Sequence, residues 1–325
     1  MTVGSRQYEV RSKGDEKLSS CFLLRTSYFL LFTIDMTSWR FIESGRCDAA
    51  YNMALDEAIV AAVRNGDSPP TLRLYGWRQP SVSLGAFQKI TDIDTSYCAA
   101  HDVHVVRRLT GGRGILHGEE LTYSFSARNE GLFSQGLLDT YRKISAAFSL
   151  GLQRLGLSVK METRRERVSN LERSPLCFKS TSYGELTING KKVIGSAQKR
   201  WGDGFLQQGS IPYTIDHTAL AAVFKNKGQR AKGKGQEVGD AGEVIPILDY
   251  AGLKDLVYDF GPQVFKVYIK ESFEILFGVS LLESLPADQE VAQAHLLCVE
   301  KYRQPLWTTG TLRTEHRNNG IQRPA

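Results

Sequence analysis

A cysteine and a lysine are the residues of this chain whose types and spacing point most directly to chemistry. Cys177 precedes Lys192 by fifteen residues, and a Gly-Ser pair at 195–196 follows the lysine. A thiolate is a good acyl acceptor, and a nearby ammonium group favours the thiolate over the thiol. The spacing therefore predicts acyl transfer through a thioester on the cysteine.

The lysine is expected to lie on a β-hairpin. Residues 183–188 alternate in character, and Asn189-Gly190 is a strong signal for a two-residue type I′ turn. Such a turn sets the register of the two strands, pairing Ile188 with Lys191, Thr187 with Lys192 and Leu186 with Val193. Alternation then places Lys191 on the face of Leu186, Ile188 and Val193, and Lys192 on the opposite face with Tyr183 and Glu185. Only one lysine can then line a cleft; the alternative is that both are solvated beside the turn.

A glycine-rich stretch forms a second candidate site. Glycines at 111, 112 and 114 follow Arg107, Arg108 and Thr110, and His117 comes next. Glycine lets the backbone approach a ligand closely and point its amides inward, so this turn could hold a phosphate, a carboxylate or a thioester oxygen. It matches neither the P-loop nor the dinucleotide fingerprint. An ordinary sharp turn would look the same, but the two arginines and the histidine favour a functional one.

Composition predicts one large globular domain, or one domain with an appendage. The chain has 325 residues, of which 42% are hydrophobic and 23% charged, and its net charge is +6. Basic residues cluster at 164–167 and 225–234. These clusters indicate either a solvated surface or contact with an acidic protein partner, and without interleaved aromatic residues we expect no nucleic-acid binding.

The cysteines and histidines argue against disulfides and metals. The five cysteines are scattered and contain no C-x-x-C motif, which is typical of a reducing, cytoplasmic compartment. The only close histidine pair is His101 and His104, and we expect no metal site. An apolar stretch at 21–34 is interrupted by Arg25 and is too short to span a bilayer, so we expect no membrane contact.

Three regions are expected along the chain. Residues 1–35 carry no motif and are predicted to be a disordered extension, or the result of an incorrectly chosen start codon. Residues 36–282 are predicted to form the catalytic domain, with a mobile Gly- and Lys-rich loop at 228–242, and residues 283–325 a C-terminal helix and tail. Asp48 is a plausible N-cap for the first helix. Hydrophobic periodicity predicts strands at 39–42, 71–75, 81–84, 103–108, 121–127 and 204–212, and helices at 51–60, 138–157, 264–277 and 289–303.

An ordered set of motifs carries a family resemblance from about Trp39 to about Gly278. These motifs are Asn52–Ala58, Leu72–Trp77, Ser83–Gln88, Arg107-Arg108 with Thr110–Gly112, His117 and Gly190–Gln198. Together they resemble the family of lipoate–protein ligases, biotin protein ligases and octanoyltransferases. The resemblance implies an α/β (α+β) fold, in which a mixed β-sheet is flanked by helices.

Within that family, a cysteine before the lysine resembles one class of octanoyltransferase. The resemblance implies that Cys177 is the thioester nucleophile and that Lys192 lowers its pKa. It implies octanoyl-acyl carrier protein as the donor and a lysine of a lipoyl domain, such as the glycine cleavage H protein, as the acceptor. It implies no cofactor, because both thioesters are already activated, and we expect a monomer. The expected substrate-binding residues are Arg107, Arg108, Thr110, Gly111, Gly112, His117, Gly195, Ser196 and Ala197, with oxyanion donors at 111–112 or 195–197.

Three other functions remain open. In an ATP-dependent lipoate–protein ligase, Cys177 would be incidental. An amidotransferase that moves octanoate between lipoyl domains would use the same cysteine and lysine. A basic binding module would leave that pair and the glycine-rich turn unexplained. Gly114 and Gly118 stand where relatives carry bulkier or acidic residues, which leaves the acyl-chain length open.

Overall fold

The computed structural model describes residues 37–162, 184–224, 251–255 and 262–310. Cys177, the predicted extension at 1–35 and the predicted loop at 228–242 lie outside the described residues.

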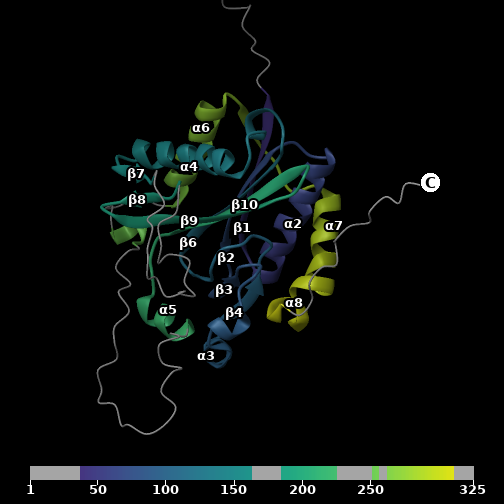
Figure 1. The fold of residues 1–325 in the computed structure, drawn as a ribbon, viewed down its shortest axis with the longest axis vertical. Coiled ribbons are helices and arrows are strands. Elements are labelled where there is room, and N and C mark those ends of the chain that lie inside the picture. Colours follow the sequence, from purple (N-terminus) through teal and green to yellow (C-terminus); the bar gives the residue numbers. More distant parts are fainter. Residues whose placement is uncertain (1–36, 163–183, 225–250, 256–261, 311–325) are drawn as a thin grey trace, which may run out of the picture. The chain divides into compact units, whose positions relative to one another are not determined.

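Eight strands form one mixed sheet, which confirms the predicted fold class (Figure 1). The strand order is β11-β1-β2-β6-β10-β9-β8-β7. β1 runs parallel to β11 and β2, and the remaining pairs are antiparallel. The strands are β1 Ser38–Cys47, β2 Thr71–Trp77, β6 Glu120–Arg128, β7 Val159–Met161, β8 Leu186–Ile188, β9 Lys191–Arg200, β10 Gly204–Pro212 and β11 Ser280–Glu283.

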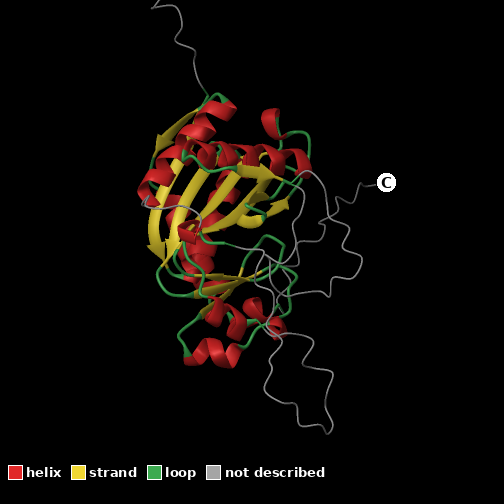
Figure 2. Cartoon of the chain, turned by 90° about the vertical axis from the view of Figure 1, so that its left-hand side faces the viewer, coloured by secondary structure: helices red, strands yellow, loops and turns green. Residues whose placement is uncertain are grey.

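A second, three-stranded sheet carries the glycine-rich turn (Figure 2). Its central strand β3 (Ser81–Leu84) is parallel to β4 (His104–Arg107) and antiparallel to β5 (Ile115–His117). The turn at 108–114 connects β4 to β5, so its position is set by the two strands that flank β3.

Helices cover both faces of the large sheet (Figure 1). Helices α4 (Leu137–Arg154) and α6 (Pro262–Phe277) pack on one face, and α2 (Ala49–Asn65) and α7 (Asp288–Leu297) on the other. The shorter helices are α3 Thr95–Ala100, α5 His217–Val223 and α8 Pro305–Thr309, with 3-10 turns at Ile90–Asp92, Gly131–Phe133 and Leu253–Asp255 and a π-helical turn at Cys298–Tyr302. Among the described helices, none is long and apolar enough to cross a bilayer.

Helix α2 begins and ends where local chemistry requires it. The carboxylate of Asp48 accepts a hydrogen bond from the Tyr51 N–H at 3.0 Å, as its predicted role as N-cap demands. The helix ends at Gly66, whose φ of 89° lies in the left-handed region that glycine adopts at low cost. Gly66 therefore terminates the helix.

A buried carboxylate ties α2 to the face of the sheet that it covers. Strand β2 alternates, so Leu72 and Leu74 enter the core beneath α4 and α6, while Arg73 faces α2. Asp56 on α2 and Arg73 are 1% and 0% exposed, and their ion pair measures 2.7 Å. Three further donors reach the Asp56 carboxylate: Tyr75 Oη at 2.9 Å, Ser124 Oγ at 2.6 Å and Gln208 Nε2 at 2.7 Å. This one carboxylate joins α2, β2, β6 and β10.

We predict that Asp56→Ala costs about 3–5 kcal/mol of unfolding free energy, because Arg73 would be left as an uncompensated buried charge. Urea unfolding followed by circular dichroism measures the loss. The matched control is Asp67→Ala, an exposed aspartate just beyond the same helix, for which a change within about 0.5 kcal/mol is expected. Equal stability of the two variants would contradict a central role for Asp56.

Candidate functional site

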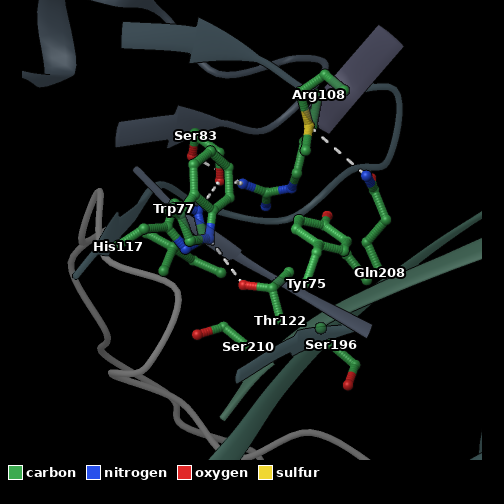
Figure 3. Close-up of a pocket in the computed structure, with 13 residues that line it drawn as sticks. Tyr75, Trp77, Ser83, Arg108, His117, Thr122, Ser196, Gln208 and Ser210 are labelled. Atoms are coloured by element: carbon green, nitrogen blue, oxygen red, sulfur yellow. Dashed lines mark hydrogen bonds between the residues drawn. The ribbon is translucent and has the colours of Figure 1, made fainter. Parts of the chain in front are cut away.

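A cavity lies where the small sheet meets the α2 side of the large sheet (Figure 3). It is partly open to solvent. An apolar group of side chains faces polar groups that can orient a ligand. The lining residues are Met53, Tyr75, Trp77, Ser83, Arg108, Ile115, His117, Thr122, Ser196, Ala197, Gln208, Gly209 and Ser210. This composition suits an apolar chain that ends in a polar head.

Arg108 holds the glycine-rich turn against this cavity. Its guanidinium group donates to the carbonyl oxygens of Ser83 at 2.8 Å, Gly111 at 2.7 Å and Arg113 at 2.8 Å. Its Nε donates to Thr110 Oγ1 at 3.2 Å. A planar guanidinium group suits this task because its donors are fixed in direction. The turn is therefore shaped by a side chain that also lines the cavity.

His117 is a second polar residue that lines the cavity. Its Nδ1 lies 2.8 Å from Glu120 Oε1 and its Nε2 lies 2.7 Å from Ser83 Oγ, while its ring stacks on Trp77 with centroids 3.9 Å apart. Because a carboxylate only accepts, the network assigns the proton to Nδ1 and leaves Nε2 as an acceptor for the Ser83 hydroxyl. Both ring nitrogens are thereby satisfied, and the ring is held in one orientation.

Gln208 joins these groups to the buried carboxylate of Asp56. Its Nε2 donates to Asp56, and its Oε1 accepts from Thr110 Oγ1 at 2.9 Å. Arg108 in turn donates to Ser83 Oγ at 3.0 Å. An unbroken chain of hydrogen bonds thus runs from Asp56 along the cavity wall to Glu120. We call it the cavity network.

Arg107 points away from the cavity, unlike Arg108. It is 2% exposed and donates to the carbonyls of Gly85 at 2.8 Å, Gln88 at 2.7 Å and Thr308 at 2.8 Å. Trp307 Nε1 donates back to the Arg107 carbonyl at 3.0 Å. Burial lowers the pKa of the Arg107 guanidinium. The residue ties α8 to the turn after β3, and its direct contact with an acyl group stays a prediction.

The hairpin that carries Lys192 has the predicted turn but one altered pair. Asn189 and Gly190 have φ of 52° and 75°, as a type I′ turn requires. Ile188 pairs with Lys191 and Thr187 with Lys192, as predicted. The prediction that Leu186 pairs with Val193 is wrong, because a β-bulge inserts one residue and Leu186 pairs with Ile194.

The two lysines have opposite environments, as the predicted faces require. Lys191 is exposed, whereas Lys192 is 1% exposed. Lys192 Nζ lies 2.5 Å from Glu185 Oε1, so the two side chains share a face. The possibility that both lysines are solvated is therefore excluded.

Lys192 is not among the lining residues of the cavity, but its partner Glu185 lines a second crevice. Ser196 lines both the cavity and the crevice, and its hydroxyl lies 2.7 Å from Tyr123 Oη. Burial raises the pKa of Tyr123 to about 12, so this phenol stays neutral. The Lys192 side of β9 and the cavity therefore meet at Ser196.

The remaining expected site residues fall into two groups. Gly195, Ser196 and Ala197 pair with β10, and of these Ser196 and Ala197 line the cavity. Gly111 and Gly112 lie in the turn, where Gly112 has a φ of 85°. Within the described ranges, no group of three or more potential metal ligands occurs.

Sequence reasoning missed most of the cavity network. Asp56 and Ser83 fall within the motifs, but the sequence predicts no role for them, nor for Glu120 and Gln208. A signal was present in β6, where Thr122, Ser124 and Ser126 alternate with apolar residues. Polar residues at every second position of a strand that is buried on both faces indicate a hydrogen-bonded site.

The family model for the lipoyl protein ligase A/B catalytic domain matches residues 48–274. The octanoyltransferase LipM of Halalkalibacterium halodurans is 36% identical over 279 residues, covering 84% of this chain and 99% of the relative. The octanoyltransferase LipM of Carboxydothermus hydrogenoformans is 37% identical over 279 residues, covering 84% of this chain and 98% of the relative.

Solved structures share the fold at lower identity. A bipartite lipoate protein ligase of Thermoplasma acidophilum has a TM-score of 0.69 at 22% identity, covering 86% of this chain and 100% of that chain. A lipoate-protein ligase A bound with ATP has a TM-score of 0.67 at 22% identity, covering 85% of this chain and 100% of that chain. At this identity the likeness concerns the fold alone.

We predict that Gly85→Ala slows acylation of the protein by an octanoyl thioester about tenfold or more. A Cβ at Gly85 would lie 2.0 Å from the Gly112 carbonyl oxygen, so the glycine-rich turn must move, and small misplacements of a site are costly. Intact mass against time measures the rate. Gly202→Ala is the control, because its Cβ meets open space. Unchanged acylation of a folded Gly85→Ala protein would remove the turn from the site.

Proposed function

The chain belongs to the lipoyl protein ligase A/B catalytic domain family, and we propose that it transfers an octanoyl group through a thioester on Cys177. The observation that carries this proposal is the identity of 36% to an octanoyltransferase over 99% of that enzyme's length. The chain is accordingly an acyltransferase of lipoate biosynthesis and protein lipoylation.

The proposed reaction has two steps at one sulfur. The Cys177 thiolate attacks the carbonyl carbon of octanoyl-acyl carrier protein, and the C–S bond to the carrier breaks, so that the carrier leaves as a thiolate and takes up a proton. The neutral amine of an acceptor lysine then attacks the new thioester, an amide forms, the amine gives up one proton, and the C–S bond to Cys177 breaks, which returns the thiolate. Each thioester is already activated, so the reaction consumes no ATP.

The groups around the proposed site have complementary tasks. The apolar side chains of the cavity are suited to an octanoyl chain, and the ammonium of Lys192 is suited to a thiolate, both as attacking and as leaving group. The N–H groups of Gly111 and Gly112 lie in a turn, whereas the β9 ladder engages part of those at 195–197. We therefore favour the turn as the place where the oxyanion is held.

The acceptor is proposed to be the lysine of a lipoyl domain, such as that of the glycine cleavage H protein. The net charge of +6 suits acidic carrier and acceptor proteins, because opposite charges speed encounter. We propose that the protein works in the cytoplasm as a monomer.

A single experiment tests the function. The protein is incubated with octanoyl-acyl carrier protein and apo glycine cleavage H protein without ATP, and the intact masses of all proteins are followed. We expect the octanoyl group to appear on the H protein. No transfer without ATP, together with lipoate-dependent exchange between ATP and pyrophosphate, would identify a ligase instead. Transfer only from octanoylated H protein would identify an amidotransferase.

Cys177→Ala is expected to abolish transfer while leaving the fold intact, because no thioester can form without the sulfur. Cys177→Ser is expected to acylate slowly and turn over poorly, because a hydroxyl group is a weaker nucleophile. Transfer rates and circular dichroism check both variants. Retention of most of the transfer rate by Cys177→Ala would exclude covalent catalysis at this residue.

Lys192→Ala is expected to slow alkylation of Cys177 at neutral pH by on the order of tenfold and to move its pH midpoint upward. The reason is that an unperturbed thiol is only roughly 3% ionised at pH 7. Lys191→Ala is the matched control and should change neither quantity, since that side chain is exposed on the other face. Iodoacetamide labelling against pH measures both, and equal midpoints in wild type and Lys192→Ala would refute the role of Lys192.

A further inference from the structure

Glu185 is the carboxylate that the described structure pairs with Lys192. The Nζ–Oε1 distance is 2.5 Å, and the two side chains are 1% and 5% exposed. The pair joins the residue before β8 to β9, across the bulged end of the hairpin. An ion pair so completely buried is costly to form, because both ions lose their water.

The state of a buried lysine depends on its counter-charge. Burial disfavours the charged form, so a buried lysine without a partner releases its proton far more readily than one in water. A carboxylate at hydrogen-bonding distance has the opposite effect and favours the ammonium form. This distinction matters for the proposed chemistry, since a neutral amine cannot stabilise a thiolate by charge.

The bond to Glu185 also orients the ammonium group of Lys192. An ammonium group carries three N–H donors, and the bond to Glu185 engages one of them. Because Lys192 donates this bond, the position of Glu185 fixes the orientation of the ammonium group. The carboxylate therefore favours the ammonium form of Lys192 and fixes its orientation.

Among the described residues near this pair, several other titratable groups make different interactions. Tyr123 on β6 and Tyr141 on α4 line the crevice with Glu185, and burial raises the pKa of Tyr123 to about 12. Lys160 and Glu162, beside β8, form an ion pair of their own at 3.4 Å. Lys191 is exposed on the opposite face.

We propose that Glu185 is a positioning residue that keeps Lys192 protonated and oriented for the thioester chemistry. The inference rests on the proposed function, in which the Lys192 ammonium favours the Cys177 thiolate. Glu185 acts through Lys192 and touches neither the thiol nor the acyl group in this account. A carboxylate that served only to stabilise the hairpin would leave the reactivity of Cys177 unchanged in a folded variant.

A double-mutant cycle separates the two roles. Iodoacetamide alkylation of Cys177 is followed against pH by peptide mass, which distinguishes it from the other cysteines. The proteins compared are wild type, Glu185→Gln, Lys192→Met and the double variant. We expect each single change to move the alkylation midpoint upward and to slow labelling at pH 7 by several-fold. The double variant should show no further shift beyond Lys192→Met, because Glu185 has no effect without the ammonium.

Controls guard against a general loss of structure. Glu162→Gln changes a carboxylate beside the same hairpin, bonded to Thr187 rather than to Lys192, and should leave the midpoint unchanged. Glu185→Gln alone removes a counter-charge from a buried ammonium group and threatens folding. The double variant removes both charges, which proteins often tolerate. Its comparison with Lys192→Met therefore remains decisive even where the single variant does not fold.

Each outcome has a defined meaning. A folded Glu185→Gln protein with the wild-type midpoint overturns the proposal, and so does a double variant that shifts beyond Lys192→Met. An unshifted Lys192→Met removes the role of Lys192 and the role of Glu185 with it. Failure of wild-type protein to transfer octanoate would overturn the proposed function while leaving the alkylation result to be judged separately.

Discussion

The carboxylate of Asp56 is the group on which the arrangement of the cavity depends. It is buried beneath α2 and receives hydrogen bonds from Arg73, Tyr75, Ser124 and Gln208. Because a buried charge is tolerated only when it is fully compensated, these donors cannot move independently of it. Gln208 is hydrogen-bonded to Thr110, and Arg108 is hydrogen-bonded to Thr110 and Ser83. The position of Asp56 therefore also constrains the glycine-rich turn. Hydrogen bonds therefore hold the turn in place, although three of its residues are glycines.

The molecule keeps two electrostatic tasks apart. The cavity network orients neutral and cationic donors around a site suited to an acyl chain. The Lys192–Glu185 ion pair lies on the hairpin instead. Ser196 on β9 borders both regions and is fixed by Tyr123. A preorganised site of this kind needs little rearrangement as charge develops, which is how enzymes obtain much of their rate enhancement.

Local chemistry made much of this structure predictable, and long-range contacts account for the rest. The Asp48 cap, the Asn189-Gly190 turn, the strand at 204–212 and the distinct faces of Lys191 and Lys192 follow from neighbouring residues alone. The bulge opposite Leu186 does not, because the insertion of one residue depends on how the whole hairpin packs. Nor could adjacency in sequence reveal that Arg107 binds α8 while Arg108 turns to the cavity. That division depends on α8, some 200 residues further along the chain.

The most direct test of the covalent mechanism is to map the acyl group in the absence of an acceptor. The protein is incubated with octanoyl-acyl carrier protein and no ATP, quenched in acid, digested and analysed by peptide mass with and without hydroxylamine. The mechanism predicts one octanoyl group on the peptide that contains Cys177, lost on treatment with hydroxylamine as a thioester should be. An unmodified protein that still transfers octanoate to an acceptor, or a stable adduct on any other residue, would contradict it.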